Sequence, residues 1–256
     1  MKEKSLLVSD YKVTSFLTNA YGKLGLYSLL NILQDIAGDH ATMLGFGYED
    51  MLRMKTFWVL TRQKVQMMRW PVQGDIITVK TWVRLGEGAL SHRDFSIFLG
   101  TEKIGECSTA WITLDAENRR PALIDRSGVL SHLTPFEKVS VDAEKIPLIK
   151  DGLSEMSKLT VRNSDIDLNM HVNNTKYAQW ILDSIPLTSH GQYNLCTYEV
   201  NFLAETKLND AIIIQKSSRD YQESGSFRSQ FQGVREADGK IVFVARLEAT
   251  GQGLEI

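Results

Sequence analysis

The residues Asp165-Ile-Asp-Leu-Asn-Met-His-Val-Asn-Asn-Thr-Lys-Tyr177 place several polar side chains directly before an amphipathic segment that continues to Pro186. Asn173 or Asn174 can cap the first turn of a helix there, and Pro186 can end it. A carboxylate, an amide and an imidazole would then lie at a helix N-terminus, where free backbone N–H groups favour negative charge. This arrangement suits a site that polarises a carbonyl and stabilises an oxyanion.

The composition of the 256 residues is ordinary for a soluble globular protein, with 43% hydrophobic and 23% charged residues. A formal net charge of −2 argues against a dedicated nucleic-acid-binding protein, which would carry an excess of basic residues. No apolar run approaches the length of a membrane span, and the N-terminus has no signal-peptide core. Two cysteines are too few for a disulfide framework, so we expect a cytoplasmic protein.

The first half of the chain combines one helix pattern with several strand patterns. A strand-like stretch at 11–17 precedes apolar residues at helical spacing from Leu26 to Leu44, and Gly45 ends that pattern. Alternating apolar and polar residues then predict strands, around 64–68, 77–83 and 94–97. Turn signals separate these strands, at Gly74-Asp75, Gly86-Glu-Gly88 and Gly100.

The second half repeats this order, with a strand, the polar loop, a helix and further strands. The predicted strands lie around 159–162, 196–203, 211–216, 227–232 and 241–247. Turn signals lie at Asn209-Asp210, Ser224-Gly-Ser226 and Asp238-Gly239, the last being a strong hairpin signal. The segment 206–210 takes the place that 71–75 has in the first half.

One helix followed by four antiparallel strands has a simple packing solution, in which the helix lies along the concave face of a curved sheet. We therefore predict an α+β protein of two tandem hot-dog domains, each a helix wrapped by a curved antiparallel sheet. The predicted N-terminal domain covers 1–115 and the predicted C-terminal domain covers 158–256. A linker at 116–157, which contains three prolines, joins them.

The pattern Asp-x-Asn-x-His-Val-Asn-Asn-x-x-Tyr-x-x-Trp, at 167–180, resembles the signature of acyl-acyl-carrier-protein thioesterases. The segments 22–34 and 58–62 resemble the first helix and the next strand of that family. Its members are double hot-dog enzymes that terminate fatty-acid synthesis in plants and some bacteria. The resemblance implies a thioester hydrolase whose partner is an acyl carrier protein bearing a fatty acyl chain. The lack of a transit-peptide-like extension favours a bacterial member or a mature form.

The resemblance also implies that four residues are catalytic: Asp167, Asn169, His171 and Glu205. His171 and Glu205 can activate a water as a general base and its partner. Asn169 can hydrogen-bond the thioester oxygen or hold the water, and Asp167 can orient either neighbour in the loop. A Glu–water–thioester scheme and a covalent anhydride scheme both fit these residues. Thr206 stands where many plant members have a cysteine, which argues against a cysteine mechanism.

The corresponding loop of the first half is Gly22-Lys-Leu-Gly25, which contains no His, Asn or acid. We therefore predict that the first half lacks a catalytic set. The resemblance implies that its apolar residues line an acyl tunnel, and ordinary core packing is the alternative for each of them. The predicted substrate-binding residues are Leu29, Leu33, Ile36, Trp58 and Leu60.

Two other functions compete with hydrolysis of acyl-acyl carrier protein: an acyl-coenzyme A thioesterase and a non-catalytic acyl-binding hot-dog protein. The complete set of four site residues argues against the non-catalytic alternative. No metal-ligand spacing and no phosphate loop is present, so we expect no cofactor. Arg119 and Arg120 are candidates for docking an acidic carrier protein, and a homodimer is one expected assembly.

The remaining histidine and cysteine positions have simpler interpretations. His40 falls on the apolar face of the first predicted helix, where a packed and hydrogen-bonded histidine is expected. Cys107 and Cys196 lie in strand patterns and are predicted to pack as small hydrophobic residues. His190 has no chemical partners around it in the sequence.

Overall fold

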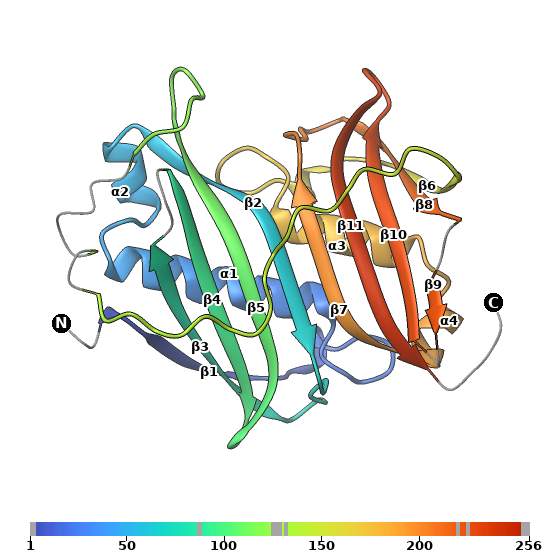
Figure 1. Cartoon of the computed structure of the whole chain (residues 1–256), viewed down its shortest axis with the longest axis horizontal. Helices are drawn as coiled ribbons and strands as arrows, with labels where there is room; N and C mark the ends of the chain where they lie inside the picture. Colours follow the sequence, from blue (N-terminus) through green and yellow to red (C-terminus); the bar gives the residue numbers. More distant parts are fainter. Residues whose placement is uncertain are drawn as a thin grey trace. The chain divides into compact units, whose positions relative to one another are not determined.

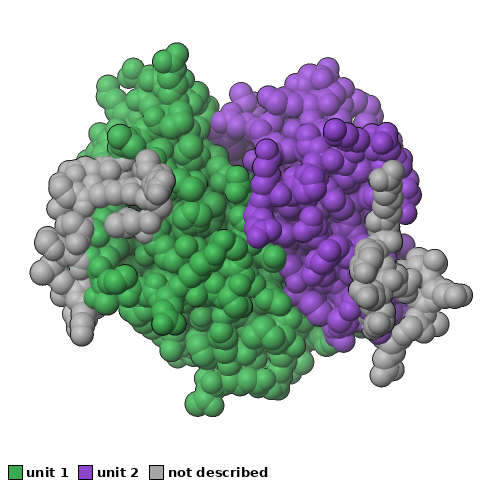
Figure 2. Space-filling view, in the orientation of Figure 1, with its two compact units in different colours: residues 1–143 green, residues 144–256 purple. Residues whose placement is uncertain are grey.

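The computed structural model describes residues 4–85, 89–123, 130, 133–218, 221–223 and 226–251. The chain divides into two compact units, Met1–Ala143 and Glu144–Ile256 (Figure 2). The turn predicted at 86–88, residues 224 and 225 of the turn predicted at 224–226, and part of the predicted linker lie outside the described residues. None of the helices in the described ranges is long and apolar enough to cross a membrane.

The first unit contains a five-stranded antiparallel sheet in the order β1-β3-β4-β5-β2. Its strands are β1 (Leu7–Lys12), β2 (Thr56–Met67), β3 (Ile76–Leu85), β4 (Leu90–Leu99) and β5 (Glu102–Asp115). Helix α1 (Leu26–Met43) lies along one face of this sheet, and the short helix α2 (Tyr48–Arg53) follows it (Figure 1). The apolar residues of α1 recur at helical spacing and are buried: Leu29, Leu30, Leu33, Ile36 and Ala37.

The second unit repeats this plan with the strand order β7-β11-β10-β8-β6, and β9 pairs with β10. Its strands are β6 (Leu153–Thr160), β7 (Tyr193–Phe202), β8 (Ala211–Ser217), β9 (Tyr221–Glu223), β10 (Ser226–Arg235) and β11 (Lys240–Gly251). Helix α3 (Asn174–Asp183) crosses the sheet, and α4 (Leu187–Gln192) follows it (Figure 1). The ring of Tyr177 packs edge-on against Phe202 and Phe243, with centroids 5.2 and 5.3 Å away. The predicted pair of hot-dog domains is confirmed.

Several short elements differ from the prediction. The first strand begins at Leu7, and residues 15–17 of the predicted strand form a 3-10 turn instead. Helices α2 and α4 were not predicted, because six residues are too few to show a helical period. Pro186 follows the end of α3, as predicted, and it also occupies the N-cap position of α4, without a side-chain capping hydrogen bond.

Hydrogen bonds to strand side chains hold the predicted linker against both units. In the first unit, the backbone N–H of Val139 donates to buried Asp94 (3.2 Å). The neighbouring N–H of Ser140 donates to buried Glu106 (2.9 Å). The segment crosses the strands on the side away from α1 (Figure 1). The strand β6 begins at Leu153, inside the range predicted as linker.

His40, near the end of α1, is fully buried. Its Nε2 lies 2.9 Å from the carbonyl oxygen of Lys4, and its Nδ1 lies 2.7 Å from Nη1 of Arg93. Because Arg93 can only donate, Nδ1 accepts and Nε2 carries the proton. Burial, together with the charge of Arg93, lowers the pKa of His40 to about 4. The prediction of a packed, hydrogen-bonded histidine is confirmed.

His40 predicts a pH dependence of stability. Its pKa falls from 6.5 in an unfolded chain to about 4 in the folded protein, so only the unfolded chain takes up the proton between these values. Stability from this group is therefore fully present above pH 6.5 and is lost as the pH falls toward 4. We expect the melting temperature to fall more steeply over this window in the wild type than in His40→Gln. Parallel melting curves against pH would contradict this account.

Candidate active site

The polar loop begins at a 3-10 turn, Asn163–Asp165, and is closed by its own backbone. The N–H of Asp167 donates to the carbonyl of His171 (2.8 Å), and the N–H of Asn169 donates to the Asp167 carboxylate (2.8 Å). Met170 completes the turn with a φ of 60°. Asp167 therefore shapes the loop that presents Asn169 and His171, and Asn169 itself is exposed to solvent.

Helix α3 starts directly after this loop. The side chain of Asn173 accepts hydrogen bonds from the N–H of Thr175 (3.0 Å) and from its hydroxyl (2.9 Å). Asn173 is thus the helix cap, one of the two asparagines predicted for that role. His171 lies two residues before the cap, beside the positive end of the α3 dipole.

A second segment, between the end of β7 and the start of β8, brings Glu205 to this loop. The N–H of Val172 donates to the carbonyl of Thr206 (3.2 Å), which ties the two segments together. Nε2 of His171 then lies 3.3 Å from a carboxylate oxygen of Glu205. The side chains of His171 and Glu205 are 25% and 43% exposed, so this pair lies at an open surface.

Thr206 faces the opposite way from Glu205. It is only 1% exposed, and its side chain lies beside the ring of Tyr177 in the interior. Burial raises the pKa of Tyr177 to about 12, so that hydroxyl stays protonated and uncharged.

Two side chains near the site were not singled out from the sequence. Lys176 approaches the carboxylate of buried Asp165, with Nζ 3.6 Å from its oxygen. Arg235, at the end of β10, donates to the backbone carbonyl of Glu205 (2.8 Å). The only sequence signal for Arg235 was its position three residues before Asp238, next to the predicted hairpin turn.

The first unit contains a loop with the same backbone hydrogen bonds. Its Asn19 takes the place of Asp167: its N–H donates to the Lys23 carbonyl (2.8 Å), and its side chain accepts from the N–H of Tyr21 (3.0 Å). The N–H of Leu24 donates to Pro71, as Val172 does to Thr206.

This match assigns each site position a counterpart in the first unit. Lys23 stands where His171 does, and the residue before Pro71, Trp70, stands where Glu205 does. The prediction that no Asn occupies a matching place was wrong for Asn19, because the loop begins earlier than 22–25. The first unit still has no imidazole and no carboxylate at the paired positions.

The five predicted substrate-binding residues all lie in the first unit. Three of them, Leu29, Leu33 and Ile36, are at most 1% exposed on the inner face of α1. Leu60 is buried on β2, and the indole N–H of Trp58 donates to the carbonyl of Phe46 (3.1 Å). The four aliphatic residues thus pack as core residues, whereas Trp58 is partly exposed.

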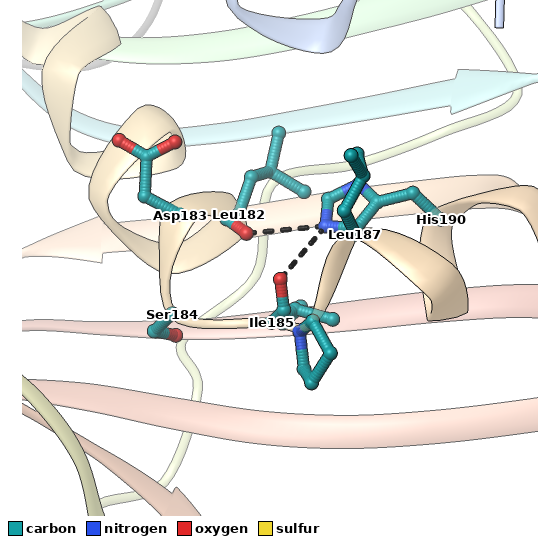
Figure 3. A pocket seen from close by; sticks show the side chains of 7 residues that line it. Leu182, Asp183, Ser184, Ile185, Leu187 and His190 are labelled. Carbon is teal, nitrogen blue, oxygen red and sulfur yellow. Dashed lines mark hydrogen bonds between the residues drawn. The ribbon is translucent and has the colours of Figure 1, made fainter. Parts of the chain in front are cut away.

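Figure 3 shows a surface hollow at the C-terminal end of α3, the end opposite to the His171 loop. The hollow measures about 430 Å³ and is lined by 182–187 and His190. His190 Nε2 points at the carbonyl oxygens of Leu182 (3.1 Å) and Ile185 (3.3 Å), which need donors at a helix end. His190 therefore caps α3, and the hollow is separate from the proposed chemistry.

In the described part of the chain, both cysteines are free thiols. No group of three or more His, Cys, Asp or Glu side chains there is arranged to hold a metal ion. Cys107 is fully buried, and burial raises the pKa of its thiol far above the ordinary value. Cys196 is partly exposed on β7 and unpaired, and its thiol contacts Asn194 and Thr250.

Comparison with known proteins places both halves in one family. The N-terminal domain of acyl-ACP thioesterases matches residues 5–128, and the C-terminal domain of acyl-ACP thioesterases matches residues 149–247. This chain therefore belongs to the acyl-ACP thioesterase family.

Curated relatives include plant enzymes. The chloroplastic oleoyl-acyl carrier protein thioesterase of Coriandrum sativum is 27% identical over 90% of this chain and 69% of its own length. The corresponding thioesterase 1 of Arabidopsis thaliana is 26% identical over 98% of this chain and 73% of its own length. A palmitoyl-acyl carrier protein thioesterase of Gossypium hirsutum is 29% identical over 77% of this chain, which spans about half of that relative.

Solved structures share the fold over nearly the whole chain. An acyl-ACP thioesterase from Bacteroides thetaiotaomicron superimposes with a TM-score of 0.84 at 23% identity, covering 97% of this chain and 99% of that one. The 12:0-ACP thioesterase from Umbellularia californica gives a TM-score of 0.84 at 20% identity, covering 96% and 94%. At this identity the likeness establishes the double hot-dog fold.

Proposed function

We propose that this protein hydrolyses the thioester of fatty acyl-acyl carrier protein, releasing a free fatty acid and the carrier thiol in fatty-acid biosynthesis. Membership of the acyl-ACP thioesterase family over both halves supports the substrate class. The observation that carries the chemistry is the 3.3 Å contact between His171 and Glu205 at the start of α3. The reaction is proposed to take place in the cytoplasm.

In the proposed mechanism, the His171–Glu205 pair takes a proton from a water, which attacks the thioester carbon. The carbonyl oxygen becomes an oxyanion, and the exposed side-chain amide of Asn169 is the proposed neutral donor to it. The intermediate collapses, the carbon–sulfur bond breaks, and the thiolate leaves and receives the proton. Asp167 acts through the backbone of the loop, because its carboxylate accepts the N–H of Asn169 (2.8 Å).

The acyl chain is proposed to pass into the first unit, along Leu29, Leu33, Ile36, Trp58 and Leu60. Leu29, Leu33, Ile36 and Leu60 are buried and Trp58 is partly exposed, and such apolar side chains suit contact with an alkyl chain. The pairing positions of that unit, Lys23 and Trp70, carry no base. The two units would thus divide chain binding and hydrolysis between them.

The central prediction concerns the proposed pair. His171→Ala or Glu205→Ala should lower turnover of acyl-acyl carrier protein by about two to four orders of magnitude, because general-base assistance is lost. Steady-state release of fatty acid measures the effect, with circular dichroism to verify folding. Near-normal turnover in folded Glu205→Ala would remove Glu205 from the mechanism. ¹⁸O appearing in Glu205 during turnover in labelled water would instead indicate the covalent anhydride scheme.

Thr206 provides a contrasting prediction at the next residue. Because its side chain is buried beside Tyr177, it cannot reach the substrate, and Thr206→Ala or Thr206→Val should keep turnover within about tenfold. Thiol-blocking reagents should likewise leave the site chemistry intact. A folded Thr206→Ala variant as inactive as His171→Ala, or an acyl group trapped on Thr206, would favour a covalent role for this residue.

The nature of the thiol partner can be tested by salt. An acidic carrier protein that docks on Lys and Arg side chains, with Arg119 and Arg120 as candidates, should show a Michaelis constant that rises with ionic strength. The matched acyl-coenzyme A substrate is the control. Salt-independent kinetics with equal use of both thioesters would favour an acyl-coenzyme A thioesterase.

A further inference from the structure

Arg235 makes three sets of contacts with its guanidinium group. Nε and Nη2 form a two-pronged ion pair with Asp238, at 3.0 and 2.7 Å. The remaining nitrogen, Nη1, donates to the backbone carbonyl of Glu205 (2.8 Å) and lies 3.6 Å from the carboxylate of Asp210. The side chain is only 19% exposed, so these contacts are partly shielded from water. A planar guanidinium with fixed donors holds such a geometry, and a lysine would not.

The segment that contains Glu205, to which Arg235 donates its hydrogen bond, is neither helix nor strand. Strand β7 ends at Phe202 and β8 begins at Ala211, so Glu205 lies in an irregular connection. The position of the Glu205 carboxylate therefore depends on contacts made by its own backbone and that of its neighbour. The Ala204 N–H donates to the Val242 carbonyl (3.2 Å) before Glu205, and the Thr206 carbonyl accepts from Val172 (3.2 Å) after it. The carbonyl of Glu205 itself is held by Arg235.

The first unit differs at this point. The strand before the matching hairpin, β4, ends at Leu99, which has no side-chain donor, whereas β10 ends at Arg235. In that unit Arg69 instead pairs with Glu102 across an exposed surface, where both side chains are more than half accessible. The hydrogen bond from an arginine at this strand end to the neighbouring connection is thus found in the unit that also contains the His171–Glu205 pair.

We propose that Arg235 is a positioning residue, which holds the backbone of Glu205 so that its carboxylate stays within reach of His171. The inference rests on the proposed function for its catalytic consequence, but the geometry it describes can be measured without turnover. Asp238 serves as the anchor for the guanidinium, and Glu205 is the group that is held.

The test compares Arg235→Ala with Arg228→Ala in the full chain. Exposed Arg228 lies on the same strand and pairs with half-buried Glu248, away from Glu205, so it controls for loss of a surface ion pair. In Arg235→Ala, kcat for acyl-acyl carrier protein should fall about 10- to 100-fold with KM changed less than about threefold, as expected when a reacting group is misplaced. Millimolar guanidinium should restore part of kcat in Arg235→Ala only.

A second readout does not depend on activity. The ring ¹H and ¹⁵N resonances of His171 should shift in Arg235→Ala toward those of Glu205→Gln, and should stay in place in Arg228→Ala. If Arg235→Ala fails to fold, Arg235→Lys is the second variant. It keeps the positive charge beside Asp238 but lacks the planar guanidinium that contacts Asp238 and Glu205 together. It should show the same shift of the His171 resonances.

Unchanged His171 resonances, or a kcat equal to that of Arg228→Ala, would overturn the positioning role. A wild type that hydrolyses no acyl thioester, but shows the resonance shift in Arg235→Ala, would refute the proposed function and leave the positioning role standing.

Discussion

The hydrogen bond from the Val172 N–H to the Thr206 carbonyl joins the two segments that carry the proposed chemistry. Val161, just before the loop, also exchanges hydrogen bonds with the same connection, donating to the Asp210 carbonyl (2.9 Å) and accepting from the Asn209 N–H (3.1 Å), but the Val172–Thr206 bond joins the residues directly beside His171 and Glu205. The first unit makes the counterpart of the Val172–Thr206 bond, from Leu24 to Pro71 (2.8 Å), but the two matching positions carry Lys23 and Trp70 instead of an imidazole and a carboxylate. The link is therefore a property of the hot-dog scaffold, and the chemistry depends on the few side chains placed on it.

The sequence was most informative where a signal is local. The cap at Asn173 and the long apolar period of α1 could be predicted, because neighbouring residues alone determine a helix start and a helical face. Glu205 lies far along the chain from His171, and no periodicity relates the two. Only the family resemblance predicted that the two side chains lie close together, and in the structure they are 3.3 Å apart. Arg235 was missed for the same reason, since its contact with Glu205 joins the end of β10 to the irregular connection between β7 and β8.

The linker shows a different reason why sequence patterns fall short. In the second unit, the N–H groups of Glu144 and Ile146 donate to the side chains of Glu199 (3.0 Å) and Asn201 (2.7 Å), both buried on β7. Polar residues that alternate along a strand normally indicate a face open to water. Here they accept backbone N–H groups of an extended segment, which satisfies both partners in the interior. A strand whose polar face lies in water and a strand whose polar face binds a buried segment show the same alternation in the sequence. Only the folded structure distinguishes the two.

The exposure of the His171–Glu205 pair has a consequence for how binding and reaction are coupled. With a quarter to almost a half of the two side chains in contact with solvent, water screens their interaction, and an exposed pair of this kind contributes little by itself. An acyl thioester that covers the pair would displace much of that water, and electrostatic interactions strengthen as the local dielectric falls. The substrate would thereby complete the environment in which the base and the oxyanion donors act. Such a site needs its backbone fixed in advance, because the substrate supplies the covering surface but not the geometry. Tethering of Glu205 to a strand end by Arg235, and of Thr206 to the loop by Val172, meets that need.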